Sequence, residues 1–218
     1  MRSAAFFDLD GTLLTVNSAS LWVRRERRLG RIRTWQLVRA ALLLAGYRMG
    51  ILDIERALRD ALATLRDVEE DHIRGQTQAW WREDVRPFVA PGSRQALERH
   101  RSKGDLLVLL TSSSLYASEM AREEFGLDVL LCQHYEVRDG RFTGEPRRPI
   151  CYGRGKVEVA EGWARENGVD LAASSFYTDS STDVPMLERV GYPFAVHPDP
   201  RLRWIARARD WPMLDWRR

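Results

Sequence analysis

Four short polar clusters in the chain contain side chains that can do chemistry: carboxylates, hydroxyls and one ammonium group. Each lies at the end of an apolar run or at the start of a helical stretch, and in chain order they are Asp8-Leu9-Asp10-Gly11-Thr12, Thr111-Ser112-Ser113, Lys156, and Asp179-Ser180-Ser181-Thr182-Asp183. Because Asp8 and Asp10 are two residues apart, their side chains lie on the same side of an extended segment. The Asp-x-Asp-Gly pattern alone is also typical of a polar turn, so the other clusters decide its meaning.

The acidic side chains Asp8, Asp10, Asp179 and Asp183 predict a bound cation if they lie together. Two like unit charges about 4 Å apart repel by about 4 kcal/mol at an effective dielectric of 20, and a phosphate dianion would add to this repulsion. An all-oxygen ligand set suits a hard cation such as Mg²⁺. The acidic clusters therefore predict a magnesium site that binds a phosphate group.

Lys156 and the hydroxyl cluster supply the other parts of a phosphate site. Lysine occurs only at Lys103 and Lys156, and the remaining Lys and Arg positions are all arginine. An ammonium group is a compact point charge that fits a tight phosphate pocket better than a planar guanidinium. Thr111 offers a hydroxyl, and the backbone N–H groups of Ser112 and Ser113 are expected to begin a helix whose N-terminus binds phosphate oxygens.

The order of apolar and helical stretches predicts how these clusters meet. The expected strands are 4–9, 106–110, 129–132, 176–177 and 194–196, and the expected helices are 92–103, 115–125, 155–166 and 185–190. This alternation is typical of a parallel sheet with helices on both faces. Because ligands bind beyond the carboxyl ends of such strands, the clusters are expected to converge at one edge of the sheet. Asp139-Gly140 predicts an additional β-hairpin.

Residues 17–86 are predicted to be helical nearly throughout and to form an insertion after the first strand. The expected elements are a helix capped by Asn17 or Ser18, a helix at 35–46, a helix capped by Asp53, and a helix with capping-box spacing at Asp67 and Glu70. The predicted domains are an α/β core of residues 1–15 and 88–218 and an all-helical cap of residues 16–87. An insertion at this point is expected to act as a lid over the ligand crevice.

Composition and termini limit the classes of protein. Hydrophobic residues make up 44% of the 218 residues and charged residues 30%, which is typical of a globular protein. Cys132 and Cys151 lie outside any CxxC spacing and predict free thiols in a reducing cytoplasm. The apolar stretch before Asp8 is too short for a signal peptide, and the longest apolar run, 40–45, is far below the ~20 residues of a membrane span.

Arginine is concentrated in the apolar, basic segment 24–48, and the whole chain has a net charge of +3 and a pI near 9.1. The arginines of this segment are Arg24, Arg25, Arg27, Arg28, Arg31, Arg33, Arg39 and Arg48. One interpretation is a solvated helix face. The other is an electropositive surface that attracts anionic substrates, or one that binds RNA or a membrane surface.

In order and spacing, the four clusters resemble the haloacid dehalogenase-like (HAD) superfamily, specifically its subfamily IB hydrolases, which include phosphoserine phosphatases. The resemblance covers nearly the whole chain, and Tyr177 to Leu187 is especially similar to the subfamily's last motif. It implies a HAD-type Rossmann-like α/β fold. It also implies a cytoplasmic, Mg²⁺-dependent phosphatase that acts on a small phosphorylated metabolite through an aspartyl-phosphate intermediate.

The resemblance implies a role for each matching residue. Asp8 would be the nucleophile, and Asp10 would protonate the leaving oxygen and then deprotonate the attacking water. Mg²⁺ would be held by Asp8, the main-chain carbonyl of Asp10, and Asp179. Asp183 would act through a metal-bound water or by orienting Lys156. The phosphoryl group would be held by three residues, Thr111, Ser112 and Lys156.

Two positions bear on the substrate. Dehalogenases and phosphonatases of this fold lack the second aspartate, so Asp10 indicates cleavage of an O–P bond. The phosphoserine phosphatases that this chain resembles carry a glutamate nine residues after the nucleophile, which holds the substrate's amino group; here that position is Asn17. A neutral amide weakens ammonium binding, although Asn17 is equally suited to cap a helix.

Three functions remain open from the sequence. The first is hydrolysis of an amino-alcohol phosphate or a phosphoserine-like monoester, and the second is a phosphotransferase or phosphomutase on the same fold. The third is a non-enzymatic module that binds polyanions or membranes through the arginines. The first predicts a small phosphorylated metabolite as partner, no nucleic acid, no membrane span, and a monomer or small homo-oligomer.

Overall fold

The computed structural model describes residues 2–31 and 54–217, and the chain divides into two compact units. The sheet unit comprises Met1–Asn17, Pro87–Gln133 and Pro149–Arg218. The helical unit comprises Ser18–Arg86 and His134–Arg148. No described helix is long and apolar enough to cross a membrane.

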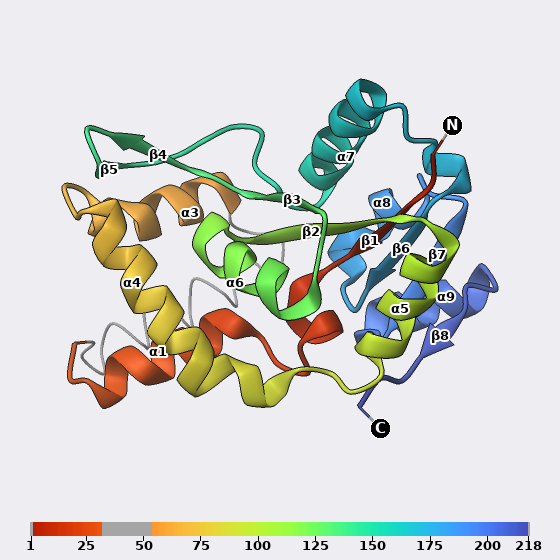
Figure 1. The fold of residues 1–218 in the computed structure, drawn as a ribbon, viewed down its shortest axis with the longest axis horizontal. Coiled ribbons are helices and arrows are strands. Elements are labelled where there is room, and N and C mark those ends of the chain that lie inside the picture. The colour runs from red at the N-terminus through yellow and green to blue at the C-terminus, as the bar shows by residue number, and fades with distance from the viewer. Residues whose placement is uncertain (1, 32–53, 218) are drawn as a thin grey trace. The chain divides into compact units, whose positions relative to one another are not determined.

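The sheet unit is built on a parallel sheet with the strand order β3-β2-β1-β6-β7-β8 (Figure 1). Its strands are β1 (Ala4–Phe7), β2 (Leu106–Ser114), β3 (Val129–Gln133), β6 (Ser175–Thr178), β7 (Tyr192–Val196) and β8 (Met213–Leu214). β1 lies between β2 and β6, and all four of its residues are buried. A continuous apolar run is the pattern of a parallel strand covered on both faces, so the predicted fold class is confirmed.

Helices cover both faces of this sheet, as the alternating pattern predicts. They are α5 (Ser93–Lys103), α6 (Leu115–Phe125), α7 (Arg154–Asn167), α8 (Val184–Leu187) and α9 (Pro200–Ala208). Phe6 packs in one apolar cluster with Ala160 and Ala164 of α7. Phe7 points to the other face, where its ring contacts His100 of α5 and stacks on Tyr177. The central strand is thereby fixed from both sides, which holds the residue that follows it.

The helical unit contains α1 (Ser18–Arg28), α3 (Ile54–Leu62) and α4 (Glu70–Trp80), together with the hairpin β4 (Tyr135–Arg138) and β5 (Arg141–Pro146). Asp139 and Gly140 both have positive φ, the backbone of a two-residue hairpin turn, so the predicted hairpin is confirmed. The hairpin clusters with this unit because β5 packs against α3. The sequence-based domain ranges place it with the core instead.

Two local expectations in the described residues are wrong. α4 begins at Glu70 without a side-chain cap, because Asp67 adopts a positive φ and its backbone N–H donates to Phe142 of the hairpin. Strand β2 continues through Ser112 and Ser113 to Ser114, so these two serines do not begin a helix; α6 begins at Leu115, as in the predicted helix range 115–125. The helix expected at 35–46 and the cap expected at Asp53 lie outside the described residues.

Candidate active site

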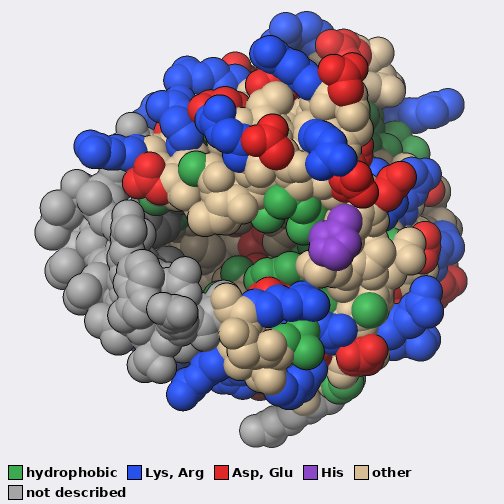
Figure 2. Space-filling view, turned by 90° about the vertical axis from the view of Figure 1, so that its left-hand side faces the viewer, with side chains coloured by type: hydrophobic (Ala, Val, Ile, Leu, Met, Phe, Trp, Pro, Cys, Tyr) green, Lys and Arg blue, Asp and Glu red, His purple; other side chains and the backbone are tan. Residues whose placement is uncertain are grey.

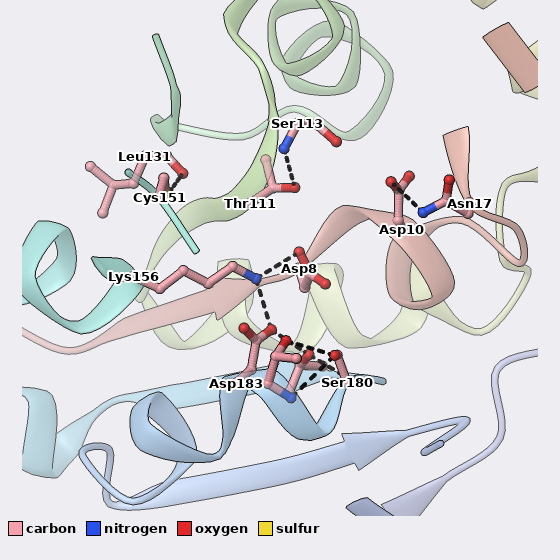
Figure 3. A network of polar contacts seen from close by, with 12 residues as sticks. Asp8, Asp10, Asn17, Thr111, Ser113, Leu131, Cys151, Lys156, Ser180 and Asp183 are labelled. Atoms are coloured by element: carbon pink, nitrogen blue, oxygen red, sulfur yellow. Dashed lines mark hydrogen bonds and ion pairs between the residues drawn. The ribbon is translucent and has the colours of Figure 1, made fainter. Parts of the chain in front are cut away.

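A buried lysine links two of the predicted acidic clusters. Asp8 directly follows β1, Lys156 lies in the first turn of α7, and Asp183 lies directly before α8. The Lys156 Nζ donates to Asp8 Oδ1 at 3.1 Å and to Asp183 Oδ2 at 2.7 Å (Figure 3). The three residues are 7%, 2% and 1% exposed in the order Asp8, Lys156, Asp183. Segments far apart in the chain therefore meet in one buried ionic network.

The approach to α7 explains how Lys156 enters this network. A Cβ atom on Gly155 would lie 1.9 Å from the carbonyl oxygen of Ile150. Any side chain at this position would push the first turn of α7 away from the preceding segment. Glycine therefore allows the close packing that brings the neighbouring Lys156 to the carboxylates.

Gly11 likewise allows a close approach, here of the Asp179 carboxylate to the turn after β1. Its φ of +74° lies in the left-handed region, and a Cβ atom there would lie 2.2 Å from Asp179 Oδ2. The tight turn after β1 thus leaves room for the carboxylate at the end of the neighbouring strand β6. Asp8 continues the pairing of these strands, since its backbone N–H donates to Tyr177 at 2.9 Å.

Burial and mutual repulsion make the aspartates of this cluster harder to ionise. Burial raises the pKa of Asp8 to about 6, against the opposing effect of Lys156 and with a further rise from Asp183 and Asp10. Burial also raises the pKa of Asp179 to about 8, and the charges of Asp8 and Asp183 add to that rise. For Lys156, burial lowers the pKa, but Asp183 and Asp8 outweigh it and raise the pKa overall. One ammonium group therefore does not neutralise the carboxylates, and an additional cation is favoured.

The donor atoms present fit Mg²⁺. Asp8 and Asp179 offer carboxylate oxygens from adjacent strand ends, and the turn after Asp8 offers main-chain carbonyl oxygen. Hard oxygen donors of this kind suit Mg²⁺, which commonly takes one or two carboxylates and keeps several waters. Among residues 2–31 and 54–217, no three His, Cys, Asp or Glu side chains form a metal-binding group.

The hydroxyl cluster differs from its prediction. Thr111 is buried, and its Oγ1 accepts a hydrogen bond from the Ser113 N–H at 3.2 Å (Figure 3). Ser112 is exposed and lies within β2, so its N–H is not at a helix N-terminus. The cap of the helix is Ser114, whose hydroxyl accepts from the Ala117 N–H, so α6 begins at Leu115 in agreement with the predicted range 115–125.

Asp10 has a polar neighbour in Asn17. The Asn17 Nδ2 donates to Asp10 Oδ2 at 3.3 Å, and in Figure 3 the Asp10 carboxylate is directed to this amide. Asn17 precedes α1, whose first residue is Ser18. The Asn17 amide therefore contacts the second aspartate of the Asp8-Leu9-Asp10 motif.

Thr178 belongs to the same network and is not among the site residues predicted from the sequence. Its side chain is fully buried at the end of β6, and its Oγ1 donates to Asp183 Oδ2 at 2.7 Å. The same oxygen accepts from the Ser180 N–H at 3.2 Å. A threonine directly before Asp179 is the only sequence signal, because a hydroxyl at a strand end has no diagnostic spacing of its own.

The two thiols take no evident part in the chemistry. Neither Cys132 nor Cys151 forms a disulfide, and both are buried. Cys151 lies near Lys156, but its Sγ donates to the Leu131 carbonyl, and burial raises the pKa of its thiol to about 12 (Figure 3). A thiol that stays protonated at neutral pH is a poor nucleophile.

Known proteins match the chain along its whole length. The family model described as haloacid dehalogenase-like hydrolase matches residues 5–188. A protein named histidinol-phosphatase from Neisseria meningitidis is 27% identical, with full coverage of both chains. A protein named phosphoserine phosphatase SerB1 from Mycobacterium tuberculosis is 29% identical over all of this chain and 72% of its own. A crystal structure from Bordetella pertussis Tohama I is 32% identical and superposes with a TM-score of 0.89 over 99% of both chains.

Proposed function

Because the chain belongs to the haloacid dehalogenase-like hydrolase family, we propose that it is a Mg²⁺-dependent phosphatase of a small phosphomonoester. The observation that supports this proposal most directly is Lys156, which bridges Asp8 and Asp183 in a buried site. Lysine fixed beside a carboxylate in this way keeps that carboxylate ionised and oriented, as a nucleophile requires. The phosphatases among its relatives support the same activity.

Mg²⁺ would be held by Asp8, the main-chain carbonyl of Asp10, and Asp179. When bound, it would neutralise the charge that a phosphate adds to the carboxylates. Thr111 and Lys156 would bind phosphoryl oxygens, with Ser112 beside them, and stabilise the charge that spreads over these oxygens in the transition state.

The reaction proceeds in two steps. An oxygen of Asp8 attacks phosphorus, the bond from phosphorus to the alcohol oxygen breaks, and Asp10 gives its proton to the leaving oxygen. Asp10, now a carboxylate, then takes a proton from water, whose oxygen attacks the phosphorus of the aspartyl phosphate. The second step releases inorganic phosphate and restores both aspartates.

For the substrate, we propose an amino-alcohol phosphate or a phosphoserine-like monoester. The histidinol-phosphatase relative, aligned over its entire length, supports an amino-alcohol phosphate. Asn17, which contacts Asp10, does not separate the two substrates, because both carry an ammonium group and a neutral amide weakens the hold on either. Selectivity would then depend on the carboxylate group that phosphoserine carries and an amino-alcohol phosphate lacks.

The test is release of inorganic phosphate from histidinol phosphate, phosphoserine and an aryl phosphate, with and without Mg²⁺. We expect Asp8→Asn to lower kcat by at least about 10³-fold, since loss of a nucleophile removes the covalent route. The matched control is Asp60→Asn, the same change at an exposed position of α3 in the helical unit. Equal rates for wild type and Asp8→Asn would refute the proposal. Transfer of phosphate to added sugars without release would identify a mutase instead.

A further inference from the structure

Asp199 connects the loop 179–183, which follows β6, to the start of helix α9. Its backbone N–H donates to the Asp179 carbonyl oxygen at 2.8 Å. Its carboxylate accepts from the Ser181 N–H through Oδ2 at 2.7 Å and from the Leu202 N–H through Oδ1 at 2.7 Å. One residue therefore contacts the loop at two places and also caps the helix.

Other hydrogen bonds hold the residues on either side of Ser181. Ser180 is held by the Thr178 hydroxyl, and the Asp183 N–H donates to the Ser180 carbonyl. Between these two anchors, the Ser181 N–H is fixed by the carboxylate of Asp199. A charged acceptor gives a stronger hydrogen bond than a neutral one, so Asp199 sets the path of the main chain directly after Asp179.

We propose that Asp199 is a positioning residue for the loop 179–183, which contains the metal ligand Asp179 of the proposed function. By fixing the main chain on either side of Ser180, it presents the Asp179 carboxylate toward Asp8 and so raises the affinity for Mg²⁺. The inference rests on the proposed function, because it concerns the same metal. Residues that orient a metal ligand typically change metal affinity 10–100-fold when they are removed.

The two contacts of the carboxylate are separable by substitution. Serine is a good helix N-cap but has a single side-chain oxygen, so Asp199→Ser retains a cap for α9 and cannot also hold Ser181. Asp199→Ala loses both contacts. The matched control is Asp170→Ala, because Asp170 also accepts a backbone N–H, that of Ala172, at 2.9 Å in the same unit.

The experiment measures Mg²⁺ binding to the full chain by calorimetry, Tm without metal, and amide hydrogen exchange at Ser181. We expect Asp199→Ser to keep a Tm close to wild type, to bind Mg²⁺ at least about tenfold more weakly, and to exchange the Ser181 N–H faster. Asp199→Ala should lower Tm as well, and Asp170→Ala should leave Mg²⁺ affinity unchanged.

Wild-type affinity in Asp199→Ser would overturn the inference while leaving the phosphatase proposal intact. Absence of Mg²⁺-dependent hydrolysis in the wild type would refute the phosphatase proposal instead. Hydrogen exchange needs no metal, so unchanged protection of Ser181 in Asp199→Ser would overturn the positioning role in either case.

Discussion

Two ion pairs, one in each unit, hold their charged side chains in different surroundings. In the sheet unit, the atoms that join Lys156 to Asp8 and Asp183 lie 2.7–3.1 Å apart, and the lysine side chain is 3% exposed. In the helical unit, Arg59 and Glu145 are 2.9 Å apart, but their side chains are 48% and 42% exposed. The distances are alike, so burial decides how much each pair contributes to the free energy of unfolding. Removing one partner of a buried pair leaves a charge without water, whereas an exposed pair is solvated and screened.

The same difference bears on the arginine-rich segment. Arg25 and Arg28 of α1 both pair with Asp84, and Arg25 also pairs with Glu83. The face of the molecule in Figure 2 shows basic and acidic side chains interspersed rather than a surface of one sign. The Arg25 and Asp84 side chains are only 14% and 15% exposed, so Arg25 is neither part of a solvated helix face nor an unpaired charge that would attract a polyanion.

The largest expected effect comes from Lys156→Ala. It leaves Asp8 and Asp183 buried without their shared cation, so we expect a loss of about 3–5 kcal/mol in the free energy of unfolding. The control is Lys103→Ala, the other lysine, which is exposed in the last turn of α5 and should change stability by no more than about 0.5 kcal/mol. Urea unfolding measures the free energy of unfolding of both variants. Similar losses of stability in Lys156→Ala and Lys103→Ala would contradict the prediction.

A smaller effect is expected from Thr178→Val, which keeps the shape of the side chain and removes the hydroxyl. Asp183 then loses a buried hydrogen bond at 2.7 Å, so we expect a loss of about 1–3 kcal/mol in stability and a lower kcat. Thr178→Ser should restore both.

A double-mutant cycle separates a role in the network from general packing. If Thr178 acts through Asp183, adding Thr178→Val to Asp183→Asn should lower kcat by much less than it does alone. Fully additive losses would show that Thr178 acts elsewhere.

The sequence predicts those parts of the site that depend on residues next to one another in the chain. Asp8 and Asp179 follow short stretches that the sequence predicts to be buried strands, and Gly11 marks the turn that follows Asp8. Thr178 and Asp199 depend on partners that only the fold brings together, such as the Ser181 N–H. The expectation that the N–H groups of Ser112 and Ser113 lie at a helix N-terminus fails for a related reason, because three serines in a row offer competing caps and the extension of β2 selects Ser114.

A third effect concerns pH and His197, whose side chain is 2% exposed. Its Nε2 accepts the Trp216 N–H at 3.0 Å, and Nδ1 lies 3.3 Å from Asp215 Oδ1. Burial and the charge of Arg217 lower the pKa of His197, although Asp215 opposes this. The folded state therefore takes up this proton less readily than the unfolded state does.

The sign of the effect follows from linkage. The stabilisation is present above the ordinary histidine pKa of about 6.5 and is lost as the pH falls through the lower folded value. His197→Asn, which tolerates the positive φ at this position and does not titrate, should remove that part of the pH dependence. Unfolding curves between about pH 5 and 8 measure it, and identical slopes for both proteins would exclude His197 as the source.

The smallest effect is expected where the charges are most exposed. Arg59 pairs with Glu145 on β5 and with Glu55 one turn earlier in α3. Arg59→Ala should therefore lower the free energy of unfolding by no more than about 1 kcal/mol, and 1 M salt should reduce that loss further. A cycle with Glu145→Ala gives the coupling energy between the two side chains. A value near the 3–5 kcal/mol expected at Lys156 would mean that exposure does not set the strength of ion pairs in this chain.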